Sequence, residues 1–338
     1  MGTTRRSLLK SAGVAAAGSM LLQGRAGAAP SASTSAEGPD LRSLSYCMLR
    51  SAQGESLGVR RENRILDVGK AGKLVRVPVP GSTDDLIAGK NVAGLNKVLA
   101  APLSATRTAY LTMEEARFGP CITRPQKIIM LGFNYRKHAI EAGVPIPKAP
   151  VLFNKYANAL SAHEGTVKLP TKVAKKFDYE VELQVILGKT ASNVSEAEAG
   201  SYVFGYATGN DFSARDLQYR DGKASQFMIG KTSDGFLPIG PWLVGAEQVP
   251  DPQKLKIETR VNGEQRQLSN TSDMIFTCAQ IIAYASSIFT LLPGDVISTG
   301  TPEGVINGKP EAQQVWLKPG DRVACSVENL GELRFELA

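Results

Sequence analysis

The twelve residues at 177–188 (FDYEVELQVILG) constrain this chain more than any other stretch. From position 181 apolar and polar residues alternate, so a strand here would place Glu180 and Glu182 together on the face opposite the valines. Two like charges roughly 7 Å apart on such a strand are costly unless a cation or solvent compensates them. Taken alone, the stretch predicts either a cation-binding edge or the solvated face of an edge strand.

A third carboxylate follows at Asp211, within residues 205–218 (GYATGNDFSARDLQ). An all-oxygen set made of Glu180, Glu182 and Asp211 suits a hard ion such as Mg²⁺, Mn²⁺ or Ca²⁺ and does not suit a soft zinc site. If Asp211 holds a metal, Arg215 and Gln218 stand nearby in sequence as donors for a carboxylate or a developing oxyanion.

The chain contains only two histidines. His138 and Glu141 are three residues apart in a segment with helical character, which places them on one face within reach of each other. A carboxylate bonded to one ring nitrogen fixes the tautomer and raises the basicity of the other, as a general base requires. Read alone, the pair is equally typical of a solvated surface. His163 lies in a turn-like stretch, and we expect no catalytic role for it.

Two further segments carry groups that could contact a substrate. Lys231 lies between glycine-containing turns at 229–241, where an isolated lysine is usually a solvated cation. Residues 298–304 (STGTPEG) follow a strand, and their backbone amides and hydroxyls could receive an anionic group. A plain turn at the end of a strand explains the second segment equally well.

The N-terminus predicts export. Residues 4–10 (TRRSLLK) contain a twin-arginine pair, residues 11–22 are too short to span a bilayer, and residues 26–28 (AGA) form a cleavage site. We therefore expect a signal peptide at 1–28 and a linker at 29–40. The mature protein would be periplasmic or secreted, with no insertion in the membrane. The alternative is a disordered basic tail.

Net charge and cysteine spacing argue against a nucleic-acid-binding protein and against a thiolate metal site. Four basic residues precede the cleavage site, and without them the formal net charge falls from +7 to +3. No basic run with interleaved aromatic residues remains, so nucleic acid is not an expected partner. The absence of C-x-x-C spacing argues against a thiolate metal site. An exported location permits a disulfide, but the sequence does not choose a pairing among the four cysteines, Cys47, Cys121, Cys278 and Cys325.

The remaining pattern predicts an α+β, β-rich fold. Residues 41–120 suggest a small N-terminal α+β domain, with strand-like runs at 44–49, 56–60 and 64–68 before a helical stretch at 83–99.

Residues 125–338 suggest a second, catalytic domain made of many short strands. Asn262 and Gly263 are typical of a type I′ hairpin turn. One helix is expected at 274–292, capped by residues 271–273.

Five motifs resemble, in the same order, those of the fumarylacetoacetate hydrolase family. They are G-x-N-Y-x-x-H at 132–138, D-Y-E-x-E-L at 178–183, N-D-x-S-A-R-D-x-Q at 210–218, G-K-x-x-D-x-F-x-P-I-G-P at 230–241 and G-T-P at 300–302. The resemblance runs from about Lys127 to the C-terminus, and residues 41–120 fit the family's variable N-terminal domain only loosely. It implies a mixed β-sheet roll around a divalent-metal site, usually in a homodimer.

Matching positions imply roles for individual residues. The metal ligands, for Mg²⁺ or Mn²⁺ with Ca²⁺ as an alternative, would be Glu180, Glu182 and Asp211. The catalytic groups would be the water-activating pair His138 and Glu141, together with Lys231. The substrate contacts would be Tyr135, Arg215, Gln218 and Thr301. Some family members take a further carboxylate ligand from just before the histidine, but residues 134–137 (NYRK) offer none. Three protein oxygens plus water and substrate are therefore expected.

These parts predict a metal-dependent hydrolase that cleaves a C–C bond of an acylpyruvate or other 1,3-dicarbonyl acid through an enolate. The partner would be a small anionic 2-oxo acid. One alternative on the same site is a 2-oxo acid decarboxylase or an enol–keto isomerase of the 2-hydroxyhepta-2,4-diene-1,7-dioate type. Another is a noncatalytic exported dicarboxylate-binding protein, against which the retention of His138 and Glu141 argues.

Overall fold

The computed structural model describes residues 39–220, 222 and 225–338. The predicted twin-arginine signal, and all but the last two residues of the predicted linker, lie outside the described residues. Within the part of the chain that is described, no helix is both long and apolar enough to cross a membrane.

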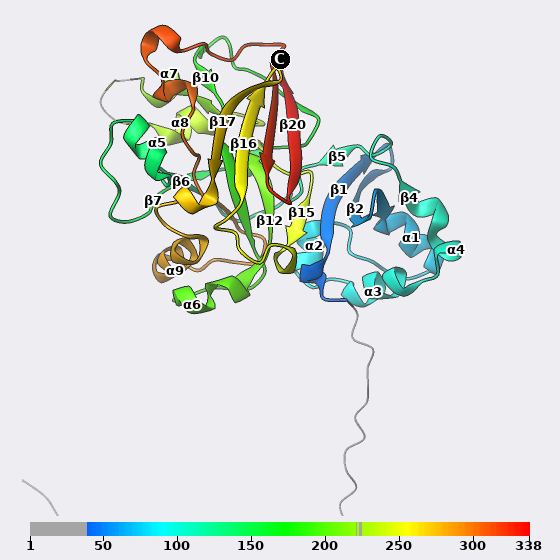
Figure 1. Cartoon of the computed structure of the whole chain (residues 1–338). Helices are drawn as coiled ribbons and strands as arrows, with labels where there is room; N and C mark the ends of the chain where they lie inside the picture. The colour runs from blue at the N-terminus through cyan, green and yellow to red at the C-terminus, as the bar shows by residue number, and fades with distance from the viewer. Residues whose placement is uncertain (1–38, 221, 223–224) are drawn as a thin grey trace, which may run out of the picture. The chain divides into compact units, whose positions relative to one another are not determined.

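The largest element is an 11-stranded sheet (Figure 1). Its strands are β1 (Ser45–Ser51), β2 (Gly54–Arg61), β3 (Arg64–Asp67), β4 (Tyr110–Leu111), β5 (Phe118–Gly119), β6 (Ile128–Gly132), β7 (Val151–Lys155), β11 (Val181–Leu187), β12 (Val203–Asn210), β15 (Leu243–Gly245) and β18 (Val296–Ser298). The order is β4-β3-β2-β1-β15-β12-β11-β18-β6-β7, with β5 paired to β1. Only β18 and β6 pair in parallel, so the sheet is mixed, and through β15 the predicted N-terminal strands join those of the C-terminal part.

A second, five-stranded sheet packs against the first, and Figure 1 shows three of its strands side by side in front of β12. Its strands are β9 (Gly165–Val167), β16 (Lys256–Val261), β17 (Glu264–Asn270), β19 (Arg322–Val327) and β20 (Gly331–Leu337), in the order β17-β16-β19-β20-β9. Asn262 and Gly263 have φ of 52° and 86° between β16 and β17, which confirms the predicted hairpin turn. Two short pairs complete the sheets: β10 (Phe177–Asp178) with β13 (Ser213–Ala214), and β8 (Leu160–Ser161) with β14 (Leu237–Pro238).

Strand β11 is buried along its whole length, on both faces. Leu183 and Val185 belong to the core that the two sheets share, together with Ile257 of β16 and Phe335 of β20. Burial of each such side chain contributes about 1.5–3 kcal/mol. Glu182 lies on the other face, so slipping the strand by one residue would drive this carboxylate into the core. The apolar face of β11 therefore fixes where its acidic face points.

The helices are short. They are α1 (Val68–Val75), α2 (Thr83–Ile87), α3 (Val92–Ala100), α4 (Leu103–Thr106), α5 (Arg136–Glu141), α6 (Glu196–Ala199), α7 (Arg215–Gln218), α8 (Phe227–Lys231) and α9 (Cys278–Ile288). Figure 1 shows α5, α7 and α8 gathered near one end of the strands.

The expectation of one helix over 83–99 is wrong, because the stretch forms two helices, α2 and α3. Gly89 and Asn91 between them have φ of 75° and 55°, a left-handed backbone that interrupts a right-handed helix.

The predicted cap of the later helix, at 271–273, is also wrong. Helix α9 begins at Cys278, where the Thr277 side chain accepts from the Gln280 amide and the Gln280 side chain accepts from the Thr277 amide. This capping box satisfies two backbone donors at once. The helix therefore begins after Thr277 and not after residues 271–273.

His163 is buried against the edge of the Phe118 ring, with centroids 5.3 Å apart. Its Nδ1 accepts a hydrogen bond from the backbone amide of Arg334 at 3.1 Å, so this nitrogen carries no proton. Burial, aided by the charge of Arg334 and opposed by that of Glu164, lowers the pKa of His163 from 6.5 to about 4. His163 therefore stabilises the fold in its neutral form.

This assignment predicts a pH dependence of stability. The unfolded chain binds a proton at His163 near pH 6.5, whereas the folded chain binds it only near pH 4, so stability is lost as pH falls through this window. His163→Asn keeps an acceptor side chain but cannot be protonated. Between pH 7 and pH 5, urea denaturation should show that the wild type loses about 1–2 kcal/mol more than the variant. Equal losses would contradict a neutral, buried His163.

Candidate active site

Three carboxylates meet where β11 and β12 lie side by side. The two strands are antiparallel with Val181 opposite Asn210, so Glu180, which precedes β11, lies beside Asp211, which follows β12. The Asp211 amide donates to the Glu180 carbonyl at 2.8 Å. With Glu182 of β11, each residue offers one oxygen, and these oxygens all lie within 4.8 Å of one another. All three residues are buried, so the alternative of a solvated strand face is wrong.

Arg215 at the start of α7 holds Glu180 in place. Its Nη2 lies 2.5 Å from Oε1 of Glu180, its Nε donates to Oδ2 of Asp178 at 2.9 Å, and its Nη1 donates to Oε1 of Gln218 at 2.9 Å. Burial alone would raise the pKa of Glu180, but Arg215 and Lys231 outweigh it and hold that pKa well below its ordinary value. All three guanidinium nitrogens are thus engaged within the protein.

Lys231 at the end of α8 bridges two of the carboxylates. Its Nζ lies 2.5 Å from Oε2 of Glu180 and 2.6 Å from Oδ2 of Asp211. The ammonium also lies 5.3 Å from the centroid of the Phe153 ring. A lysine ammonium has three protons, and among the described residues the third has no acceptor. Because Lys231 lines the cavity, this proton is available to a bound molecule.

Lys155 at the end of β7 is a second buried ammonium, which the sequence analysis did not identify. Its Nζ forms an ion pair with Oδ1 of Asp211 at 2.6 Å and donates to the backbone carbonyls of Phe212 and Phe236. Burial, aided by the charge of Lys231, lowers the pKa of Lys155 from 10.5 to about 8, against the opposing effect of Asp211. Unlike Lys231, this lysine is enclosed by protein and holds Asp211 from behind.

Glu182 is the carboxylate that no described cation contacts. Its Oε2 accepts from the Ser298 hydroxyl at 2.5 Å and from the Gly300 amide at 2.8 Å. Burial, with the negative charges of Asp211 and Glu180, raises the pKa of Glu182 well above its ordinary value. A positive charge placed beside Glu182 would relieve this cost.

These residues fit a divalent metal. The donors are all oxygen, as hard cations prefer. Around this cluster four buried carboxylates, Asp178, Glu180, Glu182 and Asp211, face three buried cations, Lys155, Arg215 and Lys231, and Glu182 is the one that none of the three contacts. Glu180, Glu182 and Asp211 are the residues that would hold Mg²⁺ or Mn²⁺.

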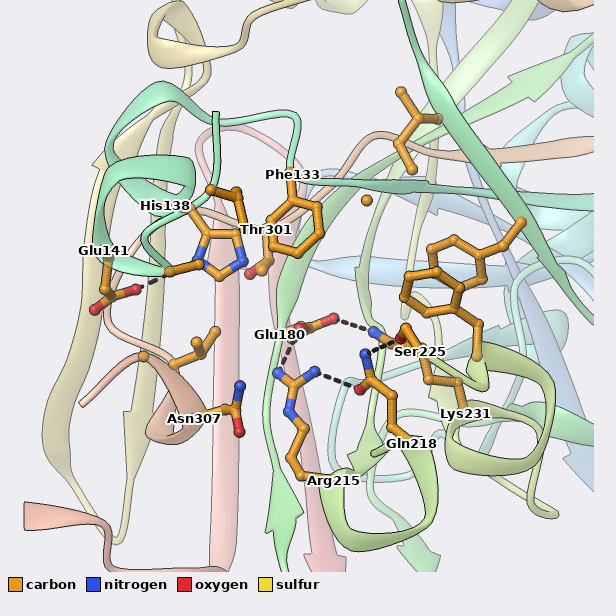
Figure 2. Close-up of a pocket in the computed structure, with 18 of the residues that line it drawn as sticks. Phe133, His138, Glu141, Glu180, Arg215, Gln218, Ser225, Lys231, Thr301 and Asn307 are labelled. Atoms are coloured by element: carbon orange, nitrogen blue, oxygen red, sulfur yellow. Dashed lines mark hydrogen bonds and ion pairs between the residues drawn. The ribbon is translucent and has the colours of Figure 1, made fainter. Parts of the chain in front are cut away.

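His138 and Glu141 lie on α5, across the cavity from the cluster (Figure 2). Nδ1 of His138 is 3.3 Å from Oε2 of Glu141, and Glu141 also accepts from the Gly304 amide at 3.0 and 3.1 Å. The ring of Phe133 stacks on the His138 ring with centroids 5.8 Å apart. The carboxylate and the stacked ring together fix the imidazole, and Nε2 is left as the acceptor.

The cavity between α5 and the cluster has a volume of about 490 Å³. The predicted residues that line it are His138, Glu141, Glu180, Glu182, Arg215, Gln218, Lys231 and Thr301. Two others do not. Asp211 lies behind Lys231, and Tyr135 is buried in the core with no hydrogen-bond partner for its hydroxyl among the described groups. The structure thus brings together every predicted site residue except Tyr135.

Sequence reasoning missed four residues that shape this site. Lys155 is the last, buried residue of a strand-like run, and this position was the only sign in the sequence that it is not a solvated lysine. Asp178 begins the D-Y-E motif, and its carboxylate accepts from the Ile306 and Asn307 amides. Gln267 donates to the Thr301 hydroxyl at 2.9 Å, and no local pattern marks it. Asn307 lines the cavity from a turn with no recognisable motif.

Comparisons with known proteins agree with this geometry. Residues 127–338 match the family described as Fumarylacetoacetate (FAA) hydrolase C-terminal. A Burkholderia lata protein, whose name goes no further than hydrolase, is 43% identical over 269 residues, which cover 79% of this chain and 92% of that protein.

Two solved structures share the fold. A 2-hydroxyhepta-2,4-diene-1,7-dioate isomerase from Mycobacterium marinum matches with a TM-score of 0.67 and 27% identity, covering 88% of this chain and 98% of that one. A fumarylpyruvate hydrolase from Pseudomonas aeruginosa, solved with Mn²⁺ and pyruvate, matches with a TM-score of 0.57 and 33% identity, covering 64% of this chain and 91% of that one.

The β-rich α+β fold predicted from the motifs is therefore confirmed. Fold and motifs together define a class of proteins built around a buried acidic cluster. This chain belongs to the fumarylacetoacetate hydrolase family.

The buried charge pairs predict a stability effect at Lys155. Lys155→Met leaves Asp211 without its rear cation, and breaking a buried pair from one side typically costs about 3–5 kcal/mol. Urea denaturation of the metal-free protein should show a loss of this size. The matched control is Lys254→Met, since Lys254 forms an exposed ion pair with Asp251 at 2.9 Å and should change stability by less than about 1 kcal/mol. Equal effects at the two lysines would contradict the role of Lys155.

Proposed function

We propose that this chain is an exported, divalent-metal-dependent hydrolase that cleaves the C–C bond of an acylpyruvate. The observation that carries the proposal is the shared cavity, across which the His138–Glu141 pair faces the carboxylate cluster and Lys231 (Figure 2). Export rests on the twin-arginine pattern at 4–10 and the cleavage site at 26–28.

The substrate would bind with its 2-oxo acid end toward Glu180 and Glu182. When bound there, a divalent cation supplies Lewis-acid stabilisation of the negative charge that develops on the 2-oxo group. The Thr301 hydroxyl accepts from Gln267, which leaves its own proton to donate to the substrate carboxylate. In this pose the C4 carbonyl would lie between Lys231 and His138.

His138 then acts as the general base. With Nδ1–H directed at Glu141, Nε2 removes a proton from a water molecule, and the resulting hydroxide attacks C4. The free proton of Lys231 donates to the oxyanion that forms, an interaction worth roughly 3–4 kcal/mol in comparable sites. Arg215 acts indirectly, because its nitrogens hold Glu180, Asp178 and Gln218 in place.

Collapse of the tetrahedral intermediate breaks the C3–C4 bond. The electron pair passes to C3 and the 2-oxo group as an enolate, and C4 leaves as a carboxylic acid. The proton held by His138 returns to C3, so the products are pyruvate and the acid of the acyl group. His138 therefore serves as base in the first half of the reaction and as acid in the second.

The rival reaction on this site is isomerisation. The Mycobacterium marinum neighbour is named as an isomerase, and a base that moves a proton between carbon atoms needs no water. Hydrolysis is favoured here because Lys231 keeps a free proton for the oxyanion that forms when water adds to a carbonyl. A 2-oxo acid decarboxylase needs neither this proton nor the base, and a dicarboxylate-binding protein would have no use for the His138–Glu141 pair.

The first functional prediction concerns the metal. Treatment with EDTA followed by gel filtration should abolish acylpyruvate cleavage, and Mg²⁺ or Mn²⁺ should restore it, because Glu182 lacks any other positive partner in the described chain. Pyruvate release measured with a coupled dehydrogenase gives the rate. Full activity after exhaustive chelation would rule out the metal site.

The second functional prediction concerns the base. His138→Ala should lower hydrolysis about 10²–10⁴-fold, the usual contribution of a positioned general base, while Mn²⁺ binding measured by calorimetry stays close to wild type. Glu141→Gln should act in the same direction with a smaller effect, since the imidazole remains.

The other histidine provides the control. His163→Asn, which is remote from the cavity, should hydrolyse at the wild-type rate. If His138→Ala folds, binds Mn²⁺ and retains full activity, the pair serves structure only. If His138→Ala loses hydrolysis but still decarboxylates oxaloacetate, then hydrolysis depends on the base and decarboxylation does not.

A further inference from the structure

Gly308 lies directly against the carboxylate of Glu141. It ends the 3₁₀ turn η7 (Ile306–Gly308) and lines the cavity together with His138 and Glu141. A Cβ placed on Gly308 would lie 2.5 Å from Oε2 of Glu141, the oxygen nearest His138, and 2.7 Å from its Cγ. Atoms in ordinary contact lie about 3.5–4.0 Å apart. Position 308 therefore has room for glycine alone while Glu141 stays in place.

The backbone does not require a glycine at this position. Gly304, four residues earlier, has a φ of 97°, in the left-handed region that favours glycine. The φ of Gly308 is not positive, so the backbone of an alanine would fit there. Gly308 therefore supplies space beside Glu141 and not conformational freedom.

The turn that carries Gly308 is anchored on its other side. The amides of Ile306 and Asn307 donate to the carboxylate of Asp178 at 2.9 and 3.1 Å, and Asp178 is fully buried. Glu141, in contrast, keeps 21% of its side chain exposed and has solvent to move into. A methyl group at position 308 would thus displace the Glu141 carboxylate and leave the turn where it is.

From these contacts we infer that Gly308 is a positioning residue for the base, because its missing side chain is what lets Glu141 reach His138. The 3.3 Å contact between Oε2 of Glu141 and Nδ1 of His138 favours the tautomer with its proton on Nδ1 and leaves Nε2 as the acceptor. The inference rests on the proposed function for the use of Nε2 as the base, whereas the steric contact itself is independent of the reaction.

The tautomer of His138 can be measured without any substrate. The chain has two histidines, and their contacts predict opposite neutral tautomers, with the proton on Nδ1 in His138 and on Nε2 in His163. Long-range ¹H–¹⁵N NMR spectra of the metal-free protein at about pH 8 should show both. In Gly308→Ala the His138 signals should shift toward the tautomer mixture of free imidazole, while those of His163 stay unchanged.

Two results of this measurement would overturn the inference. One is a wild-type His138 that already shows the mixture of tautomers. The other is a set of His138 signals that does not change in Gly308→Ala, because Glu141 would then accommodate the methyl group without leaving the imidazole.

Acylpyruvate cleavage provides a second measurement. With Mg²⁺ present, kcat should fall about 10- to 100-fold in Gly308→Ala, because small misplacements of catalytic groups have effects of this size. Mn²⁺ affinity should stay at the wild-type value. Gly200→Ala is the matched control, since Gly200 has a φ of −58° and nothing within 4 Å of its Cβ position. It should change neither kcat nor the His138 signals.

A double variant shows whether the effect passes through Glu141. Glu141→Ala removes the side chain that the methyl group would meet, so adding Gly308→Ala to it should change kcat by less than about twofold. An equal fall in both backgrounds would overturn the inference. If Gly308→Ala alone does not fold, the double variant should fold, and failure of both would contradict the steric contact. Absence of cleavage by the wild type would remove the proposed function and leave the NMR test of Gly308 in force.

Discussion

The balance of buried charge beside β11 determines how this site is built. Four carboxylates and three cations lie in an interior of low dielectric, where each unpaired charge would cost several kcal/mol. Arg215 and Lys155 are buried and hold Glu180 and Asp211 in fixed positions. Lys231 faces the cavity, and Glu182 is the carboxylate that no described cation contacts, so that burial raises its pKa. The one carboxylate of the cluster that no described cation contacts therefore lies where a divalent ion fits.

The two faces of strand β11 have different roles in this arrangement. The apolar face of β11 packs between the two sheets, and the polar face carries Glu182 toward the cavity. The turn at 304–308 joins the two halves of the chemistry, since its amides bind Asp178 on the cluster side and Glu141 on the side of the base. The positions of the acidic cluster and of the His138–Glu141 pair are thus linked through backbone contacts, as preorganised catalysis requires.

Much of this was predictable from local patterns. The alternation at 180–185 placed Glu180 and Glu182 on one face, and the three-residue spacing of His138 and Glu141 gave a pair on one side of a short helix. Long-range contacts were not predictable. Lys155 looks like a solvated lysine in the sequence, and only the packing of β7 against the carbonyls of Phe212 and Phe236 makes it a buried cation. For the same reason the ion pairs of Arg215 with Asp178 and Glu180 could not be foreseen, and only its contact with substrate was predicted.

The most direct test of the charge balance is Mn²⁺ binding, measured by electron paramagnetic resonance on the metal-free protein and on Glu182→Gln. The wild type should bind one Mn²⁺ per chain, and the variant, which stays folded because a buried charge has been removed, should bind on the order of 100-fold more weakly or worse. Glu332→Gln on the exposed face of β20 is the matched control and should bind as the wild type does. Equal Mn²⁺ affinity in Glu182→Gln and wild type would contradict the assignment of this carboxylate cluster as the metal site.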